Sequence, residues 1–490
     1  MPSILSKFFS TEWNVPYNCY EMGHGWTPYC SAAALEIGLI VFQQSLKLYA
    51  PLYLGQTILQ KKLNQKNFHE CFRSIIRSSS FLGANAFLSI LFLCLSLNLS
   101  GRFYYPLNAY IPSFFGSFLA ILIERPSRRK ALAFYVSNIA TEITYKILLT
   151  RNYIGGMKNG KFFIFSMAIT VLLFLYENNQ LNDPLICFIL QLVIGKRTSS
   201  TVKPEEQSKK PNDNDAEAIE FDAVAEKAIK KNNFWKQIQN RTNQIWLQLK
   251  NQFPILAYRN PFCYHHLSYS CLENILLQNF LKTFSIGWFS QLGLRFCSRL
   301  MAGRVNDAIN VFQIDQLLSS KYLSFALFLS TFSSVYNSTL CFSNCFHKNN
   351  ENFNQKWSTI LASTLASLST IRLASDQSMI LYLFWKSIEA LFNVGVKQGY
   401  ITNERFWIIF IYSLSCSQIF YSAILEPKQM KPSYKRFLDQ ISQNRLRYIN
   451  RNVLEVFGTN ASNGYEYFLP SYDLRFTSRK FQESVLIWLF

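Results

Sequence analysis

Four charged side chains lie inside apolar stretches, where they could bind a polar substrate or neutralise one another. Glu142 and Lys146 are four residues apart, and Lys386 and Glu389 are three residues apart. Residues at these spacings share one face of a helix, so each pair can form an ion pair of its own. A charge within a membrane span is costly unless it meets a partner or water. An internal ion pair is therefore the favoured interpretation, and a substrate pathway is the alternative.

A basic cluster, Arg125, Arg128, Arg129 and Lys130, directly follows another apolar stretch. The guanidinium group of arginine can donate two parallel hydrogen bonds to a phosphate. This basic edge could therefore bind a lipid headgroup or recruit a protein partner. The simpler interpretation is a basic stop at the membrane boundary, where Pro126 breaks the helix.

Cys19, His24 and Cys30 are the residues best suited to a metal ion. Zinc sites normally reach four ligands and contain closely spaced Cys pairs, and this segment has neither feature. A structural turn with a disulfide is therefore favoured over a metal, and we predict no metal site and no cofactor. A second stretch has the same residue types at no better spacing: Cys263, His265, His266 and Cys271.

Motifs of the common hydrolases and nucleotide-binding enzymes are absent from the sequence. It has no Gly-x-Ser-x-Gly, no His-Glu-x-x-His and no glycine pattern that cradles phosphate. We therefore expect a protein that is not an enzyme.

The composition indicates a membrane protein. Of the 490 residues, 49% are hydrophobic and only 16% are charged, whereas soluble domains carry about 25% charged residues. The formal net charge is +20. Basic loops beside apolar spans attract anionic lipid headgroups, so we expect membrane lipids rather than nucleic acid as partners.

Apolar stretches recur along the chain at a length that can cross a bilayer, which takes about 20 residues. We predict an all-α, polytopic bundle with about 8–10 transmembrane helices. The candidate spans are 32–54, 79–99, 107–123, 131–150, 161–176, 272–293, 321–343, 357–374, 378–398 and 404–425.

The chain divides into five predicted segments. A Cys/His-containing segment covers 1–31, and membrane repeats cover 32–196 and 251–427. The charged segment 197–250 is too polar for a core and is predicted to be a linker. Its second part could form a helix on the bilayer surface, or a solvated helix. Residues 428–490 are predicted to form a basic tail outside the membrane.

The two membrane repeats resemble each other. Leu46-Lys47 in the first corresponds to Leu281-Lys282 in the second, inside an apolar helix in each case. The last span of each repeat is rich in aromatic residues and begins with a basic residue, at Lys161-Phe162-Phe163 and at Arg405-Phe406-Trp407. These matches indicate an internal duplication, which is common in membrane proteins that handle small molecules.

Several blocks of the sequence resemble the transmembrane protein 135 family, also called peroxisomal membrane proteins. The opening block is Asn-Cys-Tyr-Glu-Met-Gly-His-x-Trp-x-Pro-x-Cys at 18–30. The others follow in the same order over nearly the whole chain, most weakly at 197–320. They lie at 46–54, 120–129, 138–142, 431–434 and 453–459.

This resemblance implies a multi-pass protein of mitochondrial and peroxisomal membranes. It implies roles in the balance of mitochondrial fission and fusion, by promoting a dynamin-like fission GTPase, in peroxisome organisation and in lipid metabolism. The family has no established catalytic residues to carry over, and it is distantly similar to the Tim17 membrane fold. The alternative function is a transporter or channel-like carrier for a lipid or small metabolite, with the paired charges at its site.

Overall fold

The structure, a computed structural model, describes residues 13–59, 65–155, 160–195, 244, 279–301, 320–346, 351–369, 377–459, 461–463 and 472–486. The predicted linker 197–250 lies outside these ranges, apart from residue 244. The second Cys/His stretch, which begins at Cys263, also lies outside them. The linker and the interpretation of the second Cys/His stretch therefore remain predictions.

The protein is an all-α membrane bundle, as predicted, because each of the ten apolar stretches falls on a helix where it is described. Within the described ranges, five helices are long and apolar enough to cross a membrane, fewer than the predicted 8–10. A helix such as Leu107–Ala120, with 14 residues, is too short by itself. The five are Asn67–Ser100, Gly160–Glu177, Leu323–Ser343, Met379–Lys397 and Glu404–Leu425.

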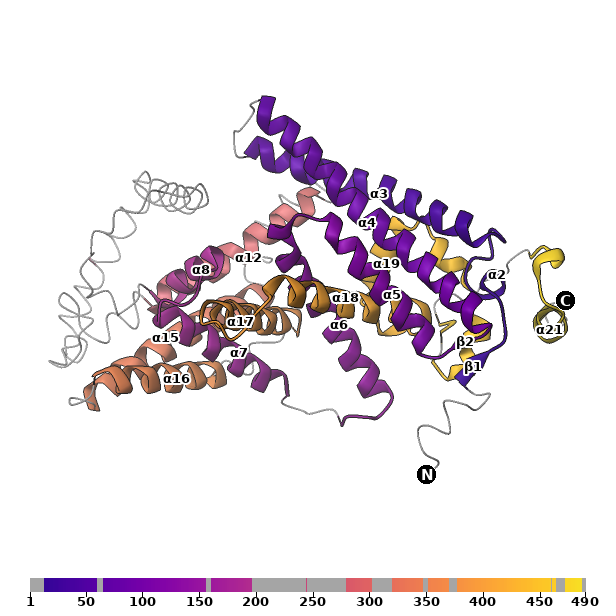
Figure 1. Ribbon diagram of the computed structural model, residues 1–490. Coiled ribbons are helices and arrows are strands. Elements are labelled where there is room, and N and C mark those ends of the chain that lie inside the picture. Colours follow the sequence, from indigo (N-terminus) through magenta and orange to yellow (C-terminus); the bar gives the residue numbers. More distant parts are fainter. Residues whose placement is uncertain are drawn as a thin grey trace. The chain divides into compact units, whose positions relative to one another are not determined.

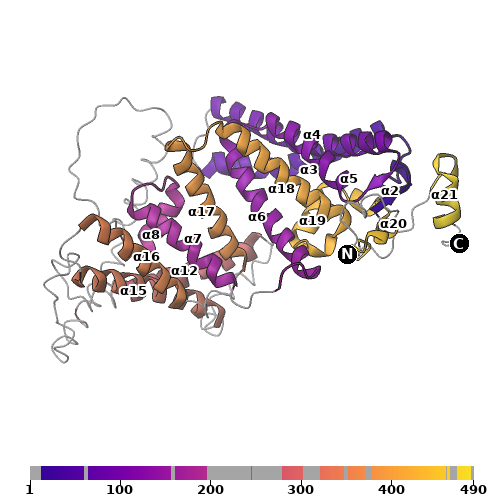
Figure 2. The ribbon, with the colours of Figure 1, turned by 60° about the horizontal axis from the view of Figure 1, so that its bottom comes forward.

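The chain folds into two compact units, one formed by residues 1–156 and 399–490 and the other by 157–398. Figures 1 and 2 together label the elements of both units. Unit 1 contains β1 (Asn14–Val15), α2 (Cys19–Met22), α3 (Cys30–Leu59), α4 (Gln65–Ser100), β2 (Phe103–Tyr104), α5 (Leu107–Ala120), α6 (Pro126–Thr150), α18 (Glu404–Leu425), α19 (Pro432–Ile441), α20 (Arg451–Leu454) and α21 (Arg479–Phe481). Unit 2 contains α7 (Gly160–Glu177), α8 (Pro184–Ile194), α12 (Lys282–Met301), α15 (Ser320–Phe346), α16 (Glu351–Ser369) and α17 (Gln377–Lys397).

The last membrane helix of each predicted repeat packs in the unit built mainly from the other repeat. Helix α7 packs against α16 and α17, whereas α18 packs against α5 and α6 (Figure 2). The preceding helices pack in matching order, α3 on α4 on α5 in unit 1 and α12 on α15 on α16 in unit 2. This reciprocal pattern fits two related repeats that exchange their fifth helix. The units are therefore divided near residues 156 and 398 rather than at the predicted linker.

Small residues let the first two long helices of unit 1 approach closely. A Cβ atom added at Gly38 of α3 would lie 2.9 Å from the Cβ of Phe87, and one at Gly83 of α4 would lie 2.9 Å from the Gly38 carbonyl oxygen. Because apolar burial gives little drive for association in lipid, close backbone packing of this kind stabilises membrane helix pairs. The helices α3 and α4 lie side by side in Figure 1.

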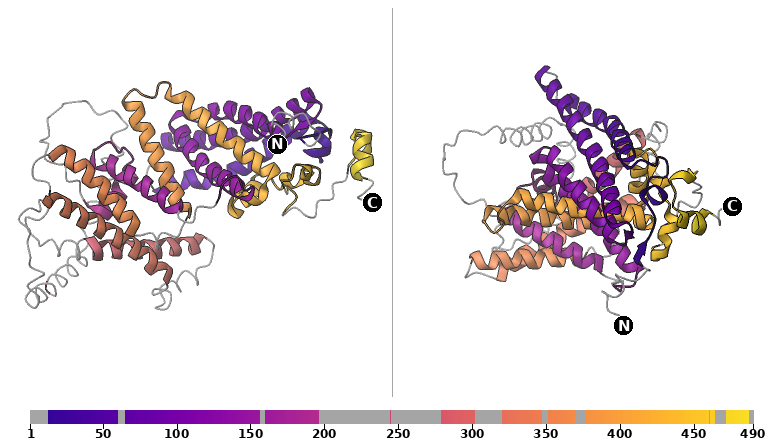
Figure 3. Two further views of the ribbon diagram at one scale, coloured as in Figure 1. Left: turned by 90° about the horizontal axis from the view of Figure 1, so that it is seen from below. Right: turned by 45° about the vertical axis from the view of Figure 1, so that its right-hand side comes forward.

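The segment 428–490, predicted to form a basic tail outside the membrane, is a folded part of unit 1 in its described residues, and its location outside the membrane remains a prediction. Helix α19 packs on α3, and its Ile441 joins a core cluster with Ile37 and Val41. The Asp473 amide donates to the Tyr20 hydroxyl at 2.9 Å. Figure 3 shows the yellow C-terminal helices beside the indigo N-terminal elements. Apolar side chains spaced along α19 favour this packing. Among the bases of the segment, Arg445 is paired with Glu36, whereas Lys428 and Arg436 are exposed.

Candidate functional site

A large apolar cavity lies within unit 1, between α3, α4, α6, α18 and α19. Its volume is about 670 Å³, within the usual range for pockets that hold small ligands, about 300–1,000 Å³. Apolar and aromatic side chains from all five helices form most of its wall. Examples are Val41, Leu82, Ala86, Ile139, Phe420 and Phe437.

A cluster of three charges lies in the wall of this cavity. The buried carboxylate of Glu142 accepts from Lys146 Nζ at 3.0 Å and from Lys431 Nζ at 2.6 Å. All three residues line the cavity. One negative and two positive groups leave a net positive charge there, so the site offers an anionic group a partner beside an apolar chamber.

The equivalent charges in unit 2 are also paired. Lys386 Nζ lies 2.9 Å from a carboxylate oxygen of Glu389 and 2.9 Å from one of Asp183. Asp183 also caps α8, because its side chain accepts from the Leu185 amide. These residues line a smaller cavity of about 260 Å³. Here the acids outnumber the base, so this site favours a cation or no ligand.

Three residues of the predicted basic edge have partners within unit 1. The guanidinium of Arg128 lies 4.5 Å from the centre of the Tyr53 ring, and that of Arg129 donates to the Leu122 carbonyl at 2.7 Å. Lys130 Nζ lies 2.7 Å from Glu404. Pro126 begins α6 rather than breaking a helix, and Arg125 is its N-cap residue. These contacts indicate that the basic edge has a structural role in unit 1, and they argue against a headgroup site.

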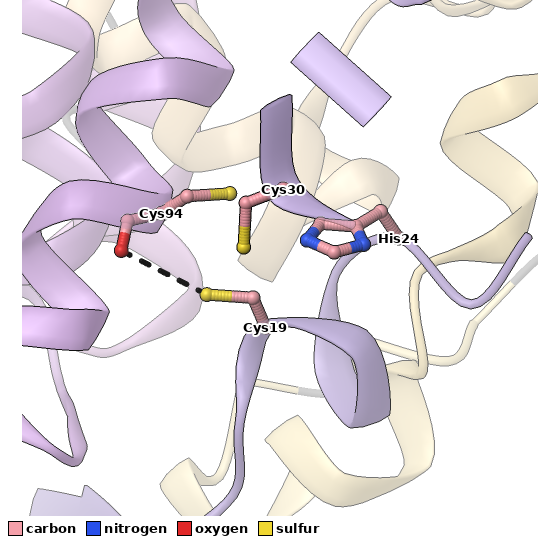
Figure 4. A group of neighbouring side chains, drawn as sticks. All are labelled: Cys19, His24, Cys30 and Cys94. Atoms are coloured by element: carbon pink, nitrogen blue, oxygen red, sulfur yellow. Dashed lines mark hydrogen bonds between the residues drawn. The ribbon is translucent and has the colours of Figure 1, made fainter. Parts of the chain in front are cut away.

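The structure brings Cys19, His24 and Cys30 together and adds a residue that the sequence analysis missed, Cys94 of α4. One potential ligand atom from each residue lies within 4.8 Å of those of the others. All three cysteines are free thiols, so the predicted disulfide is absent among them. Figure 4 shows the three sulfur atoms and a ring nitrogen of His24 directed toward one another.

The environment of this cluster changes the acidity of its thiols. The pKa of Cys19 is lowered to about 5, chiefly by a side-chain hydrogen bond with Cys94 and further by the neighbouring His24 imidazole. The pKa of Cys30 is raised, mainly because burial disfavours its thiolate. The two thiols are therefore shifted in opposite directions, although they belong to the same cluster.

A second feature missed from the sequence is a buried polar network at the end of α6. Arg151 donates to the Tyr105 hydroxyl at 2.6 Å and forms an ion pair with Glu426. The Tyr421 hydroxyl donates to the same carboxylate at 3.0 Å. Because Tyr105, Arg151 and the Tyr421–Glu426 pair come from three distant parts of the sequence, no local spacing could have indicated the network.

A comparison with known protein families identifies one region. Residues 16–149 match the family model described as the N-terminal cysteine-rich region of Transmembrane protein 135. The matched region includes all four members of the Cys/His cluster and also Glu142 and Lys146. No solved structure matches the chain.

Proposed function

We propose that this multi-pass membrane protein, whose residues 16–149 match the cysteine-rich region of the transmembrane protein 135 family, binds a lipid in the cavity of unit 1. Through that binding, it regulates the balance of mitochondrial fission and fusion, peroxisome organisation and lipid metabolism. We place it in mitochondrial and peroxisomal membranes, as the family resemblance implies. We also propose that it acts by binding rather than by catalysis.

The observation that carries this proposal is the combination of an apolar chamber with a net positive charge in its wall. An acyl chain would bury apolar surface against side chains such as Leu82 and Phe437. An anionic headgroup would interact with Lys146 or Lys431, beside the carboxylate of Glu142. A fatty acid or an acidic phospholipid has both features, so we propose this class of ligand.

The proposed partner is a dynamin-like fission GTPase, on the basis of the family resemblance. The basic edge gives this idea limited support, because Arg128, Arg129 and Lys130 already contact residues of unit 1. Replacing all four basic residues would therefore disturb the fold as well as a docking surface. An informative variant would change Arg125 alone, since the described contacts of its three neighbours would be retained.

A transporter is the second candidate function, because the cavity reaches the charges Glu142 and Lys146. Both charges are paired, however, which favours a binding site over an open pathway. Uptake of a labelled fatty acid by vesicles that contain the purified protein would distinguish the two. Protein-dependent uptake would support the transporter, whereas binding without uptake would support the lipid-binding regulator.

The proposed binding site can be tested by filling the cavity. Ala86 of α4 lines it, so Ala86→Trp should block a ligand. Leu99→Trp is the matched control, because Leu99 lies on the same helix and is 80% exposed. We expect Ala86→Trp to reduce crosslinking of a photoreactive fatty acid to the purified full chain by about tenfold, equivalent to about 1.4 kcal/mol. Leu99→Trp should have no such effect.

The charge in the cavity wall can be tested separately. Lys431→Ala should weaken labelling by an anionic probe more than labelling by its neutral methyl ester. Lys428→Ala is the control, because Lys428 is exposed and lies just before α19.

In cells that lack the protein, the cavity-filling variants test the proposed regulation of mitochondrial dynamics: Leu99→Trp should restore mitochondrial length and Ala86→Trp should not. Equal labelling of Ala86→Trp and the unmodified chain would refute the proposed site.

A further inference from the structure

Cys19, His24 and Cys94 lie in the wall of the unit 1 cavity, next to Cys30, but the lipid-binding proposal assigns these four residues no role. We propose that these four residues bind one structural zinc ion, which joins the N-terminal segment to α4. Three donors come from the short region around α2 and the start of α3, and the fourth comes from a helix more than sixty residues further along the chain. The tertiary fold thus supplies the ligand that the local spacing lacks.

The arrangement of the donor atoms suits a tetrahedral metal ion. Their mutual separations are all within 4.8 Å. Zinc–sulfur bonds of about 2.3 Å in a tetrahedron place sulfur atoms about 3.8 Å apart. Small side-chain movements toward a common centre would therefore complete the site, with no rearrangement of the helices. In Figure 4, the three sulfur atoms lie on one side of the imidazole ring of His24, and the proposed ion would bind between them and the ring.

His24 has the environment of a metal ligand. Its side chain is buried, with 3% of the residue exposed. Nδ1 lies 2.7 Å from the Thr27 carbonyl oxygen, to which it can donate, and Nε2 has no hydrogen-bond partner among the described residues. A histidine that binds zinc typically donates one ring N–H to a carbonyl oxygen and uses the other nitrogen for the metal. A buried nitrogen without a partner would otherwise be costly.

The chemistry of the donors selects the ion. A set of three cysteine sulfurs and one imidazole is typical of closed structural zinc sites. Cys19 and Cys94 are buried and Cys30 is half-buried, so the four protein ligands leave no position for a substrate. Each thiol would release its proton on binding, and His24 would bind as neutral imidazole. Zinc would therefore stabilise the packing of α2 and α3 against α4 rather than catalyse a reaction.

Metal content tests the proposal directly. We would purify the full chain in detergent with zinc present and measure bound zinc by mass spectrometry, expecting about one ion per chain. Cys94→Ser and His24→Ala should lose it. Cys71→Ser is the matched control, because Cys71 is a buried thiol on the same helix but outside the cluster. His24→Cys should keep the metal, because a fourth thiolate replaces the imidazole as a ligand, and this separates loss of a ligand from misfolding.

Cobalt gives a second measurement, which reports the ligands and the geometry of the site. Reconstitution of the chain with Co²⁺ should produce the intense visible absorption of a tetrahedral thiolate complex, and Cys94→Ser should abolish it while Cys71→Ser retains it. Zinc content of the unmodified chain at the level of Cys94→Ser would overturn the proposal. A disulfide between any two of the three cysteines in the purified protein would overturn it as well. The test of lipid binding measures labelling of the cavity by a fatty acid, so the two proposals are judged by different measurements.

Discussion

The ion pair between Arg151 and Glu426 is the contact whose loss has the most predictable cost. Only 5% of the Glu426 side chain is exposed, compared with 28% of the Arg151 side chain. Arg151→Gln would therefore leave a buried carboxylate without its cation. The two tyrosine hydroxyls of the network, Tyr105 and Tyr421, would remain, and only Tyr421 donates to Glu426 in the described contacts.

The size of the effect follows from this burial. Removal of one partner from a fully buried ion pair costs about 3–5 kcal/mol. The remaining hydrogen bond from Tyr421 and the partial exposure of Arg151 lower the cost, because water can reach the space that Arg151 leaves. We therefore expect a loss of about 2–3 kcal/mol. For a unit of this size, such a loss lowers Tm by about 4–12 °C.

Thermal unfolding of the full chain in detergent, followed by tryptophan fluorescence, measures this loss. Arg73→Gln provides the control, because it removes an exposed arginine on α4. Glu426→Gln should cost less than Arg151→Gln, since a neutral amide can remain buried with Tyr421. Adding Glu426→Gln to Arg151→Gln should recover part of the lost stability. If Arg151→Gln lowers Tm no more than Arg73→Gln, the network does not stabilise unit 1 and the reasoning is wrong.

Three further changes should destabilise the protein, and each is measured as a shift in Tm. Gly116→Ala places a Cβ atom 2.8 Å from the Ser89 Cα, a backbone atom that cannot move aside, and should lower the free energy of unfolding by about 1–3 kcal/mol. Gly155→Ala is the control, because Gly155 has open space around it and should tolerate the change. Arg451→Met removes a buried guanidinium that donates to two carbonyl oxygens and should cost about 2 kcal/mol, with faster proteolysis after α18. Lys386→Met leaves acids unpaired in unit 2 and should cost about 1–2 kcal/mol, partly recovered by adding Glu389→Gln.

Hydropathy was sufficient to predict where the long helices lie. The predicted stretches 161–176 and 404–425 closely match α7 and α18. The short separations within the Glu142–Lys146 and Lys386–Glu389 pairs likewise indicated ion pairs that the structure contains. These features depend on one helix at a time, so local sequence determines them.

Features that depend on contacts between distant helices were not predictable in this way. Cys94 lies in an apolar run, where a thiol resembles any small hydrophobic residue, and only the return of α4 toward α2 brings it to Cys19. The Lys431 contact with Glu142 and the exchange of α7 and α18 have the same origin. Hydrophobic periodicity identifies the buried face of a helix, but not the helix that covers it.

The packing of α18 against α5 and α6 has a consequence for biosynthesis. The hydroxyls of Ser137 and Ser415 lie 2.8 Å apart, and the Asn85 amide donates to Tyr412 at 3.0 Å. During translation, α4 and α6 are synthesised long before the ribosome reaches residue 404, so the polar side chains that later contact α18 must wait for their partners. An insertase or chaperone that shields such faces would be needed during this interval, and a chain truncated before α18 should be recognised by quality control and degraded.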